Sequence, residues 1–197
     1  FGGSTIDSGV INDLVKYSPV TNEWTTMTSG CSRRCFHSMV AIGSALFVYG
    51  GLSELSSMRN DCWKYDTITG SWTQVVSGTR IRSHHAATVV ASEMYVFGGF
   101  SAAYSNQSDM IKYNPYSNAW TEVQCHNIGR SDHAMASVGN IVFVIGGSKD
   151  GSTNTREVFQ YTTTTNSWAA VNSLPAEYSV QAPCATVVNS CILIHGG

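Results

Sequence analysis

Charged residues are scarce in this chain of 197 residues. Asp, Glu, Lys and Arg make up 12% of the sequence, about half of their share in ordinary globular proteins, and serine and threonine fill the polar positions. The formal net charge is −2 and no run of basic residues is present. Because binding to a phosphate backbone needs a basic surface, we expect no nucleic acid among the partners.

Long hydrophobic runs are also absent. No apolar segment approaches the roughly 20 residues that span a bilayer, so we expect no membrane insertion, and no signal-peptide pattern is present. The chain opens within a motif, at the Phe-Gly-Gly of residues 1–3, and stops within a similar one, at the Ile-His-Gly-Gly of residues 194–197. These ends predict a segment of a longer protein.

A period of 48 residues organises what the sequence does contain. Tryptophans, tyrosines and glycine pairs each recur with this spacing and in a constant phase. They are Trp24, Trp72, Trp120 and Trp168, then Tyr17, Tyr65, Tyr113 and Tyr161, then Gly2-Gly3, Gly50-Gly51, Gly98-Gly99 and Gly146-Gly147. A last pair, Gly196-Gly197, follows after a gap of 50. Three kinds of residue that share one period indicate copies of one supersecondary unit.

Each unit has the pattern of four short β-strands. In the second unit, residues 35–42 and 45–49 are largely apolar and flank a Gly-Ser turn, while residues 61–66 and 71–76 alternate between apolar and polar. No window of the unit has helical periodicity. Four strands per 48 residues are typical of a β-propeller blade, whose faces are buried only when copies pack side by side around an axis. The sequence therefore predicts an all-β fold.

The order of the landmarks resembles the kelch repeat. The double glycine closes the second strand, an acidic residue stands four positions before the tyrosine, and the tryptophan follows seven positions after it. The acids are Asp13, Asp61, Asp109 and Glu157, and Arg-x-x-His segments open the first strand at Arg34/His37, Arg82/His85 and Arg130/His133. The resemblance covers the whole chain. It implies four-stranded antiparallel blades of a kelch-type propeller, in a ring of six or seven blades.

This resemblance divides the chain into parts of a single propeller segment. We expect the last two strands of a blade at 1–28, complete blades at 33–76, 82–124 and 130–172, and the first two strands of another blade at 180–197. The remaining blades are expected outside the segment. Because the two partial blades are complementary, a closed ring of four blades is the less favoured alternative.

Two departures from the family pattern stand out. Adaptors that combine a BTB domain with kelch repeats usually have Glu two positions before the tyrosine. This chain has Val15, Trp63, Ile111 and Phe159 there. Its repeats are therefore more similar to those of kelch-domain proteins without BTB partners. The last unit has Val180, Gln181 and Pro183 in place of the Arg-x-x-His pattern, so this unit has diverged.

The cysteines do not follow the period. They are Cys31, Cys35, Cys62, Cys125, Cys184 and Cys191. A disulfide framework would recur in each unit, so we expect free thiols and favour a cytoplasmic over an extracellular location. One N-glycosylation motif, at Asn106, is weak evidence for secretion. We expect no zinc site, because the Cys-rich segments 31–35 and 125–126 belong to loops two blades apart.

Residues that share the period are interpreted as scaffold. The glycine pairs admit positive φ and close approach of the backbone between sheets, and no helix or Walker lysine follows them. The periodic arginines and histidines should each make the same local contact in their own blade. The acids should pair with arginine or accept from backbone donors. We therefore expect neither a metal nor a cofactor at the three histidines.

Residues that break the period are the functional candidates. Antiparallel tracing places the loops between second and third strands on the same face as the loops between blades. We predict that a protein partner binds this face, at Asp7, Arg33, Arg59, Arg80, His84, Tyr104, Asp132, Lys149 and Asp150. Mixed charges with an aromatic residue are typical of a protein-binding surface.

The resemblance implies a non-enzymatic domain for protein–protein interaction, such as a substrate receptor, a cytoskeletal binder or an assembly scaffold. Galactose oxidase and a sialic-acid mutarotase have similar propellers, so the propeller of an enzyme is an alternative. Copper chemistry would need two Tyr and two His outside the repeat, and the non-periodic histidines are His84, His126 and His195. No catalytic triad is recognisable. An extracellular adhesion or glycan-binding module is the third alternative.

Overall fold

The computed structural model describes residues 1–197 except Ser8, Leu55 and Tyr104. All regular elements of the described residues are β-strands, and none of these residues forms a helix that could cross a membrane. Three four-stranded antiparallel sheets dominate the fold, in the strand orders β5-β6-β7-β8, β12-β11-β10-β9 and β13-β14-β15-β16. We call them blades 1, 2 and 3. They confirm the predicted all-β fold with four-stranded antiparallel blades.

The strands of the blades are short and regular. Blade 1 contains β5 (Ser38–Ile42), β6 (Ala45–Tyr49), β7 (Cys62–Asp66) and β8 (Ser71–Val75). Blade 2 contains β9 (Ala86–Val90), β10 (Glu93–Phe97), β11 (Met110–Asn114) and β12 (Ala119–Glu122). Blade 3 contains β13 (Ala134–Val138), β14 (Ile141–Ile145), β15 (Val158–Thr162) and β16 (Ser167–Ala170).

Two-stranded sheets flank the blades. The N-terminal pair is β3 (Val15–Ser18) with β4 (Glu23–Thr26), preceded by the small ribbon of β1 (Ser4–Thr5) and β2 (Gly9–Val10). The C-terminal pair is β17 (Cys184–Val188) with β18 (Cys191–His195). The N-terminal pair has the Tyr–Trp register of the outer two strands of a blade, whereas β17 packs beside β13 as an innermost strand does.

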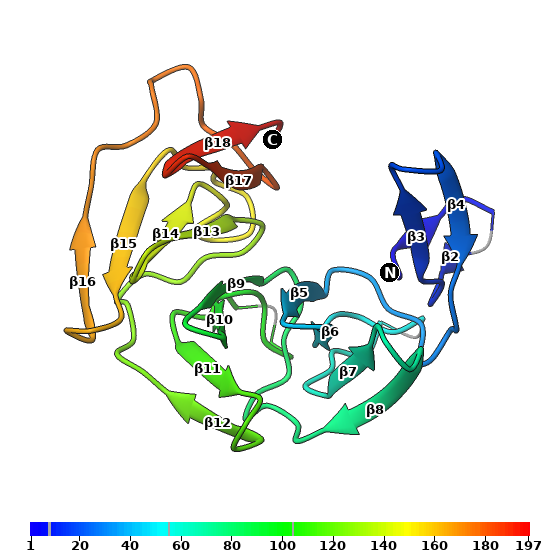
Figure 1. The fold of residues 1–197 in the computed structure, drawn as a ribbon. Helices are drawn as coiled ribbons and strands as arrows, with labels where there is room; N and C mark the ends of the chain where they lie inside the picture. The colour runs from blue at the N-terminus through cyan, green and yellow to red at the C-terminus, as the bar shows by residue number, and fades with distance from the viewer. Residues whose placement is uncertain (8, 55, 104) are drawn as a thin grey trace.

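The blades stand side by side around a common centre (Figure 1). The first strand of each blade is innermost, since β9 contacts both β5 and β13, and β13 also contacts β17. The N-terminal and C-terminal pairs lie at the two ends of this arc (Figure 1).

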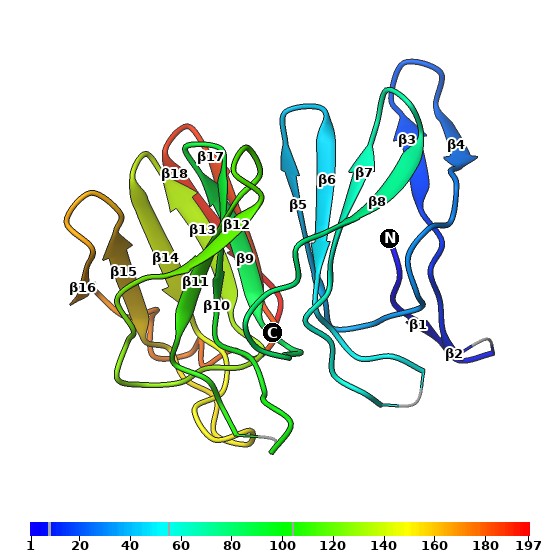
Figure 2. The same ribbon diagram turned by 90° about the horizontal axis from the view of Figure 1, so that it is seen from below.

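The two kinds of connection lie on opposite faces. Tight hairpins join the first strand to the second and the third to the fourth, and they gather on one face (Figure 2). The longer loops within blades, such as residues 50–61 and 98–109, share the other face with the connections between blades (Figure 2). We call this second face the long-loop face. Its composition from these two kinds of loop is the one predicted from antiparallel tracing.

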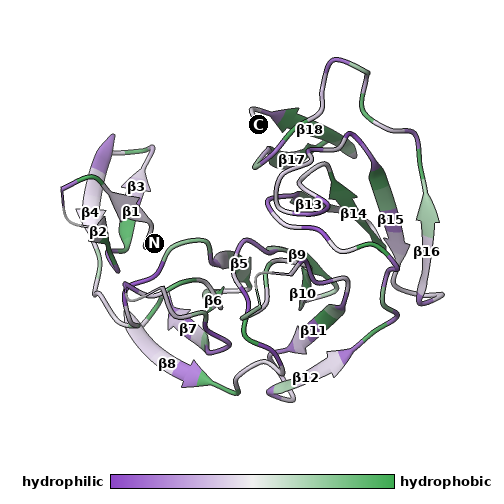
Figure 3. Ribbon diagram, turned by 180° about the vertical axis from the view of Figure 1, so that it is seen from behind, coloured by the Kyte–Doolittle hydropathy of each residue, from purple (hydrophilic) through white to green (hydrophobic). Residues whose placement is uncertain are grey.

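The hydrophobic core lies between neighbouring blades. Phe47 and Tyr49 of blade 1 pack with Met94, Val96 and Ile111 of blade 2, and all five are almost completely buried. A second cluster joins blades 2 and 3, and a third joins blade 3 to the C-terminal pair. The strands of blade 3 and of the C-terminal pair are correspondingly hydrophobic, whereas the N-terminal pair is paler or hydrophilic (Figure 3). The apolar side chains of one blade are therefore buried against those of the neighbouring blade.

The glycine pairs connect the backbone of one blade to the next. The N–H of Gly51 donates to the carbonyl of Arg82 at 2.9 Å, and the N–H of Gly99 donates to the carbonyl of Arg130 at 2.7 Å. Gly51 has φ of +96°, and a Cβ there would stand 2.6 Å from the carbonyl oxygen of Cys35. A side chain is excluded both by the conformation and by the space, as the sequence predicted.

Each buried arginine also binds its own blade. Arg34 donates to both carboxylate oxygens of Asp61, at 2.9 and 2.8 Å, and to the carbonyl of Gly50 at 2.9 Å. The corresponding pairs are Arg82–Asp109 and Arg130–Glu157, and all three arginine side chains are fully buried. Loss of one carboxylate would leave an uncompensated buried guanidinium, which costs about 3–5 kcal/mol. The periodic acids are therefore scaffold, in agreement with the prediction.

The periodic Trp, Tyr and Asn side chains connect the blades at the outer rim. Trp120 donates its indole N–H to the carbonyl of Val76 in the preceding blade at 2.9 Å. Asn118 accepts the Tyr113 hydroxyl at 2.8 Å and the N–H of Val76 at 3.2 Å. The equivalent contacts recur around Trp168 and Asn166. Two of the sequence landmarks therefore belong to one inter-blade contact.

Blade 1 lacks one part of this contact. Gly70, with φ of +68°, occupies the position of Asn118 and Asn166. The Tyr65 hydroxyl is buried and has no hydrogen-bond partner among the described residues. A Cβ on Gly70 would be 3.7 Å from that hydroxyl, an ordinary contact. An asparagine would fit this position and supply the missing acceptor.

We predict that Gly70→Asn stabilises the protein by about 1 kcal/mol, because a buried hydroxyl gains an acceptor and asparagine tolerates positive φ. Thermal denaturation should show a midpoint roughly 2–4 °C higher. Gly70→Ala is the matched control and should be destabilising, since it adds strain without an acceptor. A lower midpoint for Gly70→Asn than for Gly70→Ala would contradict this account.

The periodic histidines lie at the blade interfaces and share one ring contact. His37, His85 and His133 are edge-on to Phe1, Tyr49 and Phe97, at 5.4, 5.3 and 5.5 Å between ring centroids. His85 Nε2 is 2.9 Å from the Ser38 hydroxyl of the preceding blade. Ala86 stands 48 residues after Ser38, so no hydroxyl is available at that position for His133. The repeated ring contact agrees with the expectation of one shared contact for the histidines, and His85 adds a hydroxyl contact to it. Burial lowers the pKa of His133 to about 3 and that of His37 to about 4, with the charge of the adjacent arginine adding to the effect.

These lowered pKa values predict a stability that falls in mild acid. The unfolded chain binds a proton at each histidine below about pH 6.5, whereas the folded state takes it up only near its lower pKa. Stability should thus decrease as pH falls from about 6.5 to about 4, by on the order of 3 kcal/mol for His133 alone.

Urea denaturation between pH 7.5 and 4 measures this slope. His133→Leu removes the titrating ring and should have a shallower slope than the wild type. Equal slopes in the two proteins would show that His133 is not the group that titrates.

Candidate functional site

Four residues line the centre of the long-loop face, one just before each innermost strand. Phe36, His84, Asp132 and Ala182 precede β5, β9, β13 and β17, and all have φ between +50° and +57°. The N–H of His84 donates to the carbonyl of Phe36, that of Asp132 to His84, and that of Ala182 to Asp132, at 2.7–3.0 Å. We call this arrangement the channel mouth. Its backbone is the same in every blade, whereas its side chains all differ.

An aromatic stack occupies one side of the channel mouth. The rings of Phe36 and His84 are stacked at 3.9 Å with an interplanar angle of 18°, and Phe100 contacts His84 edge-on at 5.2 Å. Phe36 remains 51% exposed. Positive φ is uncommon for a bulky residue and costs of order 1–3 kcal/mol. The hydrogen-bonded backbone of the channel mouth explains the positive φ of Phe36. It does not explain why the phenyl ring is exposed.

The sequence analysis did not select Phe36. The signal was available, because Phe36 stands 48 residues before His84, and His84 stands 48 before Asp132. Position-by-position alignment of the repeats would have shown three unlike side chains at one place. His84 and Asp132 are among the predicted residues, whereas the apolar Phe36 is not, because charged and polar side chains determined that set.

Asp132 and His84 are neighbours at the channel mouth. The Asp132 carboxylate accepts a hydrogen bond from the Gln181 amide at 3.3 Å. Burial lowers the pKa of His84, and the Asp132 carboxylate opposes that effect by raising it. The net pKa lies below the ordinary value, so His84 is neutral at pH 7. The predicted residues His84 and Asp132 are thus brought together.

Three predicted cations surround the buried ion pairs of the scaffold. Lys149 contacts Glu157 at 2.6 Å, and Arg80 lies 3.9 Å from Asp109. Burial raises the pKa of Asp61, but the hydrogen bonds and charge of Arg34 outweigh it, so the pKa lies below its ordinary value. The charge of Arg59 adds to this lowering. Arg59, Arg80 and Lys149 therefore cap the scaffold at the long-loop face and are not a single cluster.

The remaining predicted residues are dispersed. Arg33 forms an exposed ion pair with Glu54 at 2.9 Å. Asp150 accepts from the backbone N–H groups of Ser152 and Thr153, and these bonds lower its pKa. Asp7 is exposed between β1 and β2. Tyr104 lies outside the described residues.

The cysteines and the glycosylation motif do not form a site. All six cysteines are free, and Cys31, Cys35 and Cys62 are buried. The described residues contain no group of three His, Cys, Asp or Glu side chains that could hold a metal ion. The Asn106 side-chain amide donates to the carbonyl of Ser148 in the next blade at 2.8 Å. The nitrogen that a glycan would modify therefore serves as an inter-blade contact.

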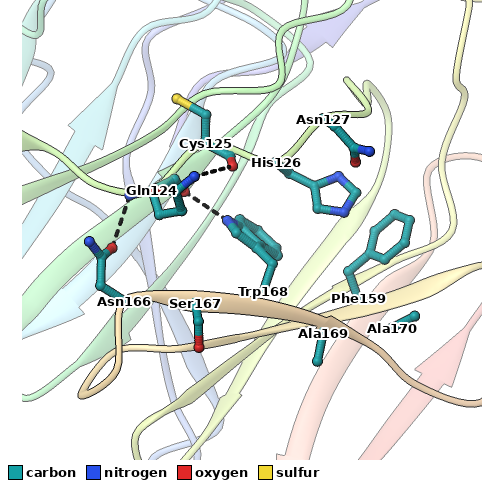
Figure 4. A pocket seen from close by; sticks show the side chains of 10 residues that line it. All are labelled: Gln124, Cys125, His126, Asn127, Phe159, Asn166, Ser167, Trp168, Ala169 and Ala170. Atoms are coloured by element: carbon teal, nitrogen blue, oxygen red, sulfur yellow. Dashed lines mark hydrogen bonds between the residues drawn. The ribbon is translucent and has the colours of Figure 1, made fainter.

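A shallow hollow of about 510 Å³ lies at the outer rim of blade 3 (Figure 4). His126 contacts Phe159 at 4.1 Å and Trp168 at 5.0 Å between ring centroids. Its Nδ1 accepts the N–H of Ile128 at 3.1 Å, and burial lowers its pKa. The Trp168 indole turns toward the Gln124 carbonyl (Figure 4), with which it forms the rim contact described above.

Comparisons with known proteins agree with this architecture. No curated protein matches the sequence. A solved structure titled "Structure of YjhT" superposes with a TM-score of 0.78 at 17% identity, over 87% of this chain and 62% of that one. At this identity the likeness concerns the fold alone, and the chain spans less than two thirds of that structure. A family model described as the KLHDC2/KLHL20/DRC7 Kelch-repeats domain matches residues 1–197. The chain therefore belongs to the kelch-repeat family.

Proposed function

We propose that the chain is a non-enzymatic interaction domain that binds a protein partner through the long-loop face, centred on the channel mouth. It acts as a scaffold that holds the partner. Kelch repeat domains generally mediate protein interactions, and the coarse assignment follows from the family. The binding face and the absence of catalysis are our proposal.

The observation that carries the proposal is the exposed Phe36 ring. His84 stacks on the Phe36 ring, and Phe100 in turn contacts His84 edge-on, so little side-chain entropy of Phe36 remains to be lost on binding. Full burial of a Phe side chain contributes about 2 kcal/mol. Aromatic anchors surrounded by polar residues are typical of the centres of protein interfaces.

The opposite face supports this choice by contrast. Its hairpins are short, and their polar side chains satisfy their own turns, as Asp66 does for the N–H groups of Ile68 and Thr69. Exposed apolar residues such as Ile68 and Tyr116 occur there singly, at the tips of separate hairpins. Scattered apolar residues of this kind need no functional explanation.

The free cysteines suit a reducing compartment. We therefore extend the proposal to a cytoplasmic location, where the domain could hold a substrate or a cytoskeletal protein.

Photo-crosslinking tests the proposed face. The photoreactive amino acid p-benzoylphenylalanine would replace Phe36 on the long-loop face or Tyr116 on the hairpin face, which are 51% and 84% exposed. We expect Phe36→p-benzoylphenylalanine to crosslink a defined protein in cells, and the Tyr116 variant to give none of that product.

Both substitutions replace an exposed aromatic residue with an aromatic one, so each is a matched control for the other. A second test combines Phe36→Ala with purified crosslinked partner, and affinity should fall about tenfold. Crosslinking of the same protein from Tyr116 alone would place the interface on the hairpin face and contradict the proposal.

A further inference from the structure

We propose that the channel mouth receives an arginine side chain of the protein partner, with the guanidinium on Asp132 and the alkyl stem against the Phe36–His84 stack. This inference rests on the proposed function and names the chemistry of the group that the face binds.

Asp132 is half-buried, whereas Asp7, Asp13 and Glu177 are exposed, and it differs from the other carboxylates of the long-loop face. Four of those are bound to cations, in the pairs Arg33–Glu54, Arg34–Asp61, Arg82–Asp109 and Arg130–Glu157, and Asp150 is held by its own turn. Asp132 makes no ion pair within the described part of the chain, and its side-chain partner is the neutral Gln181 amide at 3.3 Å. It is a half-buried carboxylate that retains acceptor capacity for a cation.

The neighbouring imidazole does not supply that cation. His84 lies next to Asp132 along the hydrogen-bonded backbone of the mouth, and it is neutral at pH 7 because burial outweighs the attraction of the carboxylate. Its Nδ1 lies 3.0 Å from the Ser83 hydroxyl, so its polar edge is engaged within its own loop. The ring presents an aromatic surface to the mouth.

The combination of a carboxylate and an aromatic stack matches arginine better than other side chains. A guanidinium pairs with a carboxylate through two parallel hydrogen bonds and also stacks on aromatic rings. The apolar stem of arginine can cover the exposed Phe36 ring. A lysine would provide the charge but not the planar fork, and a neutral side chain would bury Asp132 without compensation. Charge complementarity thus commits the mouth to a basic occupant.

Three blocked pentapeptides provide the direct test. They are acetyl-Gly-Gly-Arg-Gly-Gly-amide, the same peptide with citrulline, and the same peptide with lysine. Citrulline has nearly the shape of arginine without its charge. NMR titration should show saturable shifts of the Phe36, His84 and Asp132 signals with the arginine peptide. The lysine peptide should bind more weakly, and the citrulline peptide at least about tenfold more weakly.

Asp132→Asn is the decisive variant. Asparagine tolerates positive φ as well as aspartate does, so the fold and the Gln181 contact can persist while the charge is lost. We expect affinity for the arginine peptide to fall about tenfold. Asp66→Asn is the matched control, because it removes the same charge from a carboxylate that holds its own turn on the hairpin face and should leave binding unchanged.

The outcomes separate this inference from the proposed function. Equal binding of the arginine and citrulline peptides would overturn the inference, as would unchanged binding to Asp132→Asn. If Phe36 still crosslinks a protein in either case, the proposed interface stands and only the arginine is wrong. If Phe36 gives no crosslink while the arginine peptide binds through Asp132, the mouth is a guanidinium site and the proposed protein-binding role fails.

Discussion

The hydrogen bond from the second glycine of a pair to a carbonyl in the next blade is the contact on which the propeller depends, and the acceptor is an arginine carbonyl for Gly3, Gly51 and Gly99. The same arginine holds the carboxylate of its own blade, and in blades 1 and 2 it also binds the carbonyl of the first glycine. A four-stranded sheet has two faces to bury, and each interface here uses residues of two blades. The hydrogen bonds that align one blade with the next therefore also bring together the side chains of the hydrophobic clusters.

This registration also decides which residues are free for function. The buried arginines precede the innermost strands, and two residues after each of them the chain turns through positive φ to form the channel mouth. Backbone hydrogen bonds link Phe36, His84, Asp132 and Ala182 in series. The side chain at this position can therefore vary from blade to blade without loss of the scaffold. Phenylalanine, histidine and aspartate occur there in turn. The mouth is accordingly rigid in its backbone and specific in its side chains, which suits a binding surface.

The period predicted the blades, the two faces and the Arg–acid pairs because each of these depends on contacts that are repeated. It could not predict which variable residues meet, since that depends on how the blades are placed around the axis. Arg33 and Asp150 looked equivalent to Asp132 in the sequence, yet one forms an exposed ion pair and the other closes its own turn. Phe36 was not predicted, although His84 and Asp132 occupy the equivalent positions, because an apolar side chain in a loop carries no charge to mark it. Only the stacking geometry with His84 distinguishes it.

Departures from the period are coupled across the blade interfaces. Where blade 1 has Tyr49, whose hydroxyl donates to the Arg80 carbonyl at 2.8 Å, blade 2 has Phe97. The residue opposite Tyr49 is Gly78, where a Cβ would collide with the tyrosine hydroxyl at 2.3 Å from it, whereas Phe97 faces His126 at 6.5 Å between ring centroids. The tyrosine hydroxyl of blade 1 is thus missing at Phe97, and the imidazole of His126 stands where the other interface has Gly78. His126 also lines the hollow at the rim of blade 3. Because a change in one blade is accommodated by its neighbour, the repeat tolerates substitution in pairs. The Phe36 ring stays 51% exposed although it stacks on His84 of the next blade, and this exposure is the basis of the proposed binding of a partner.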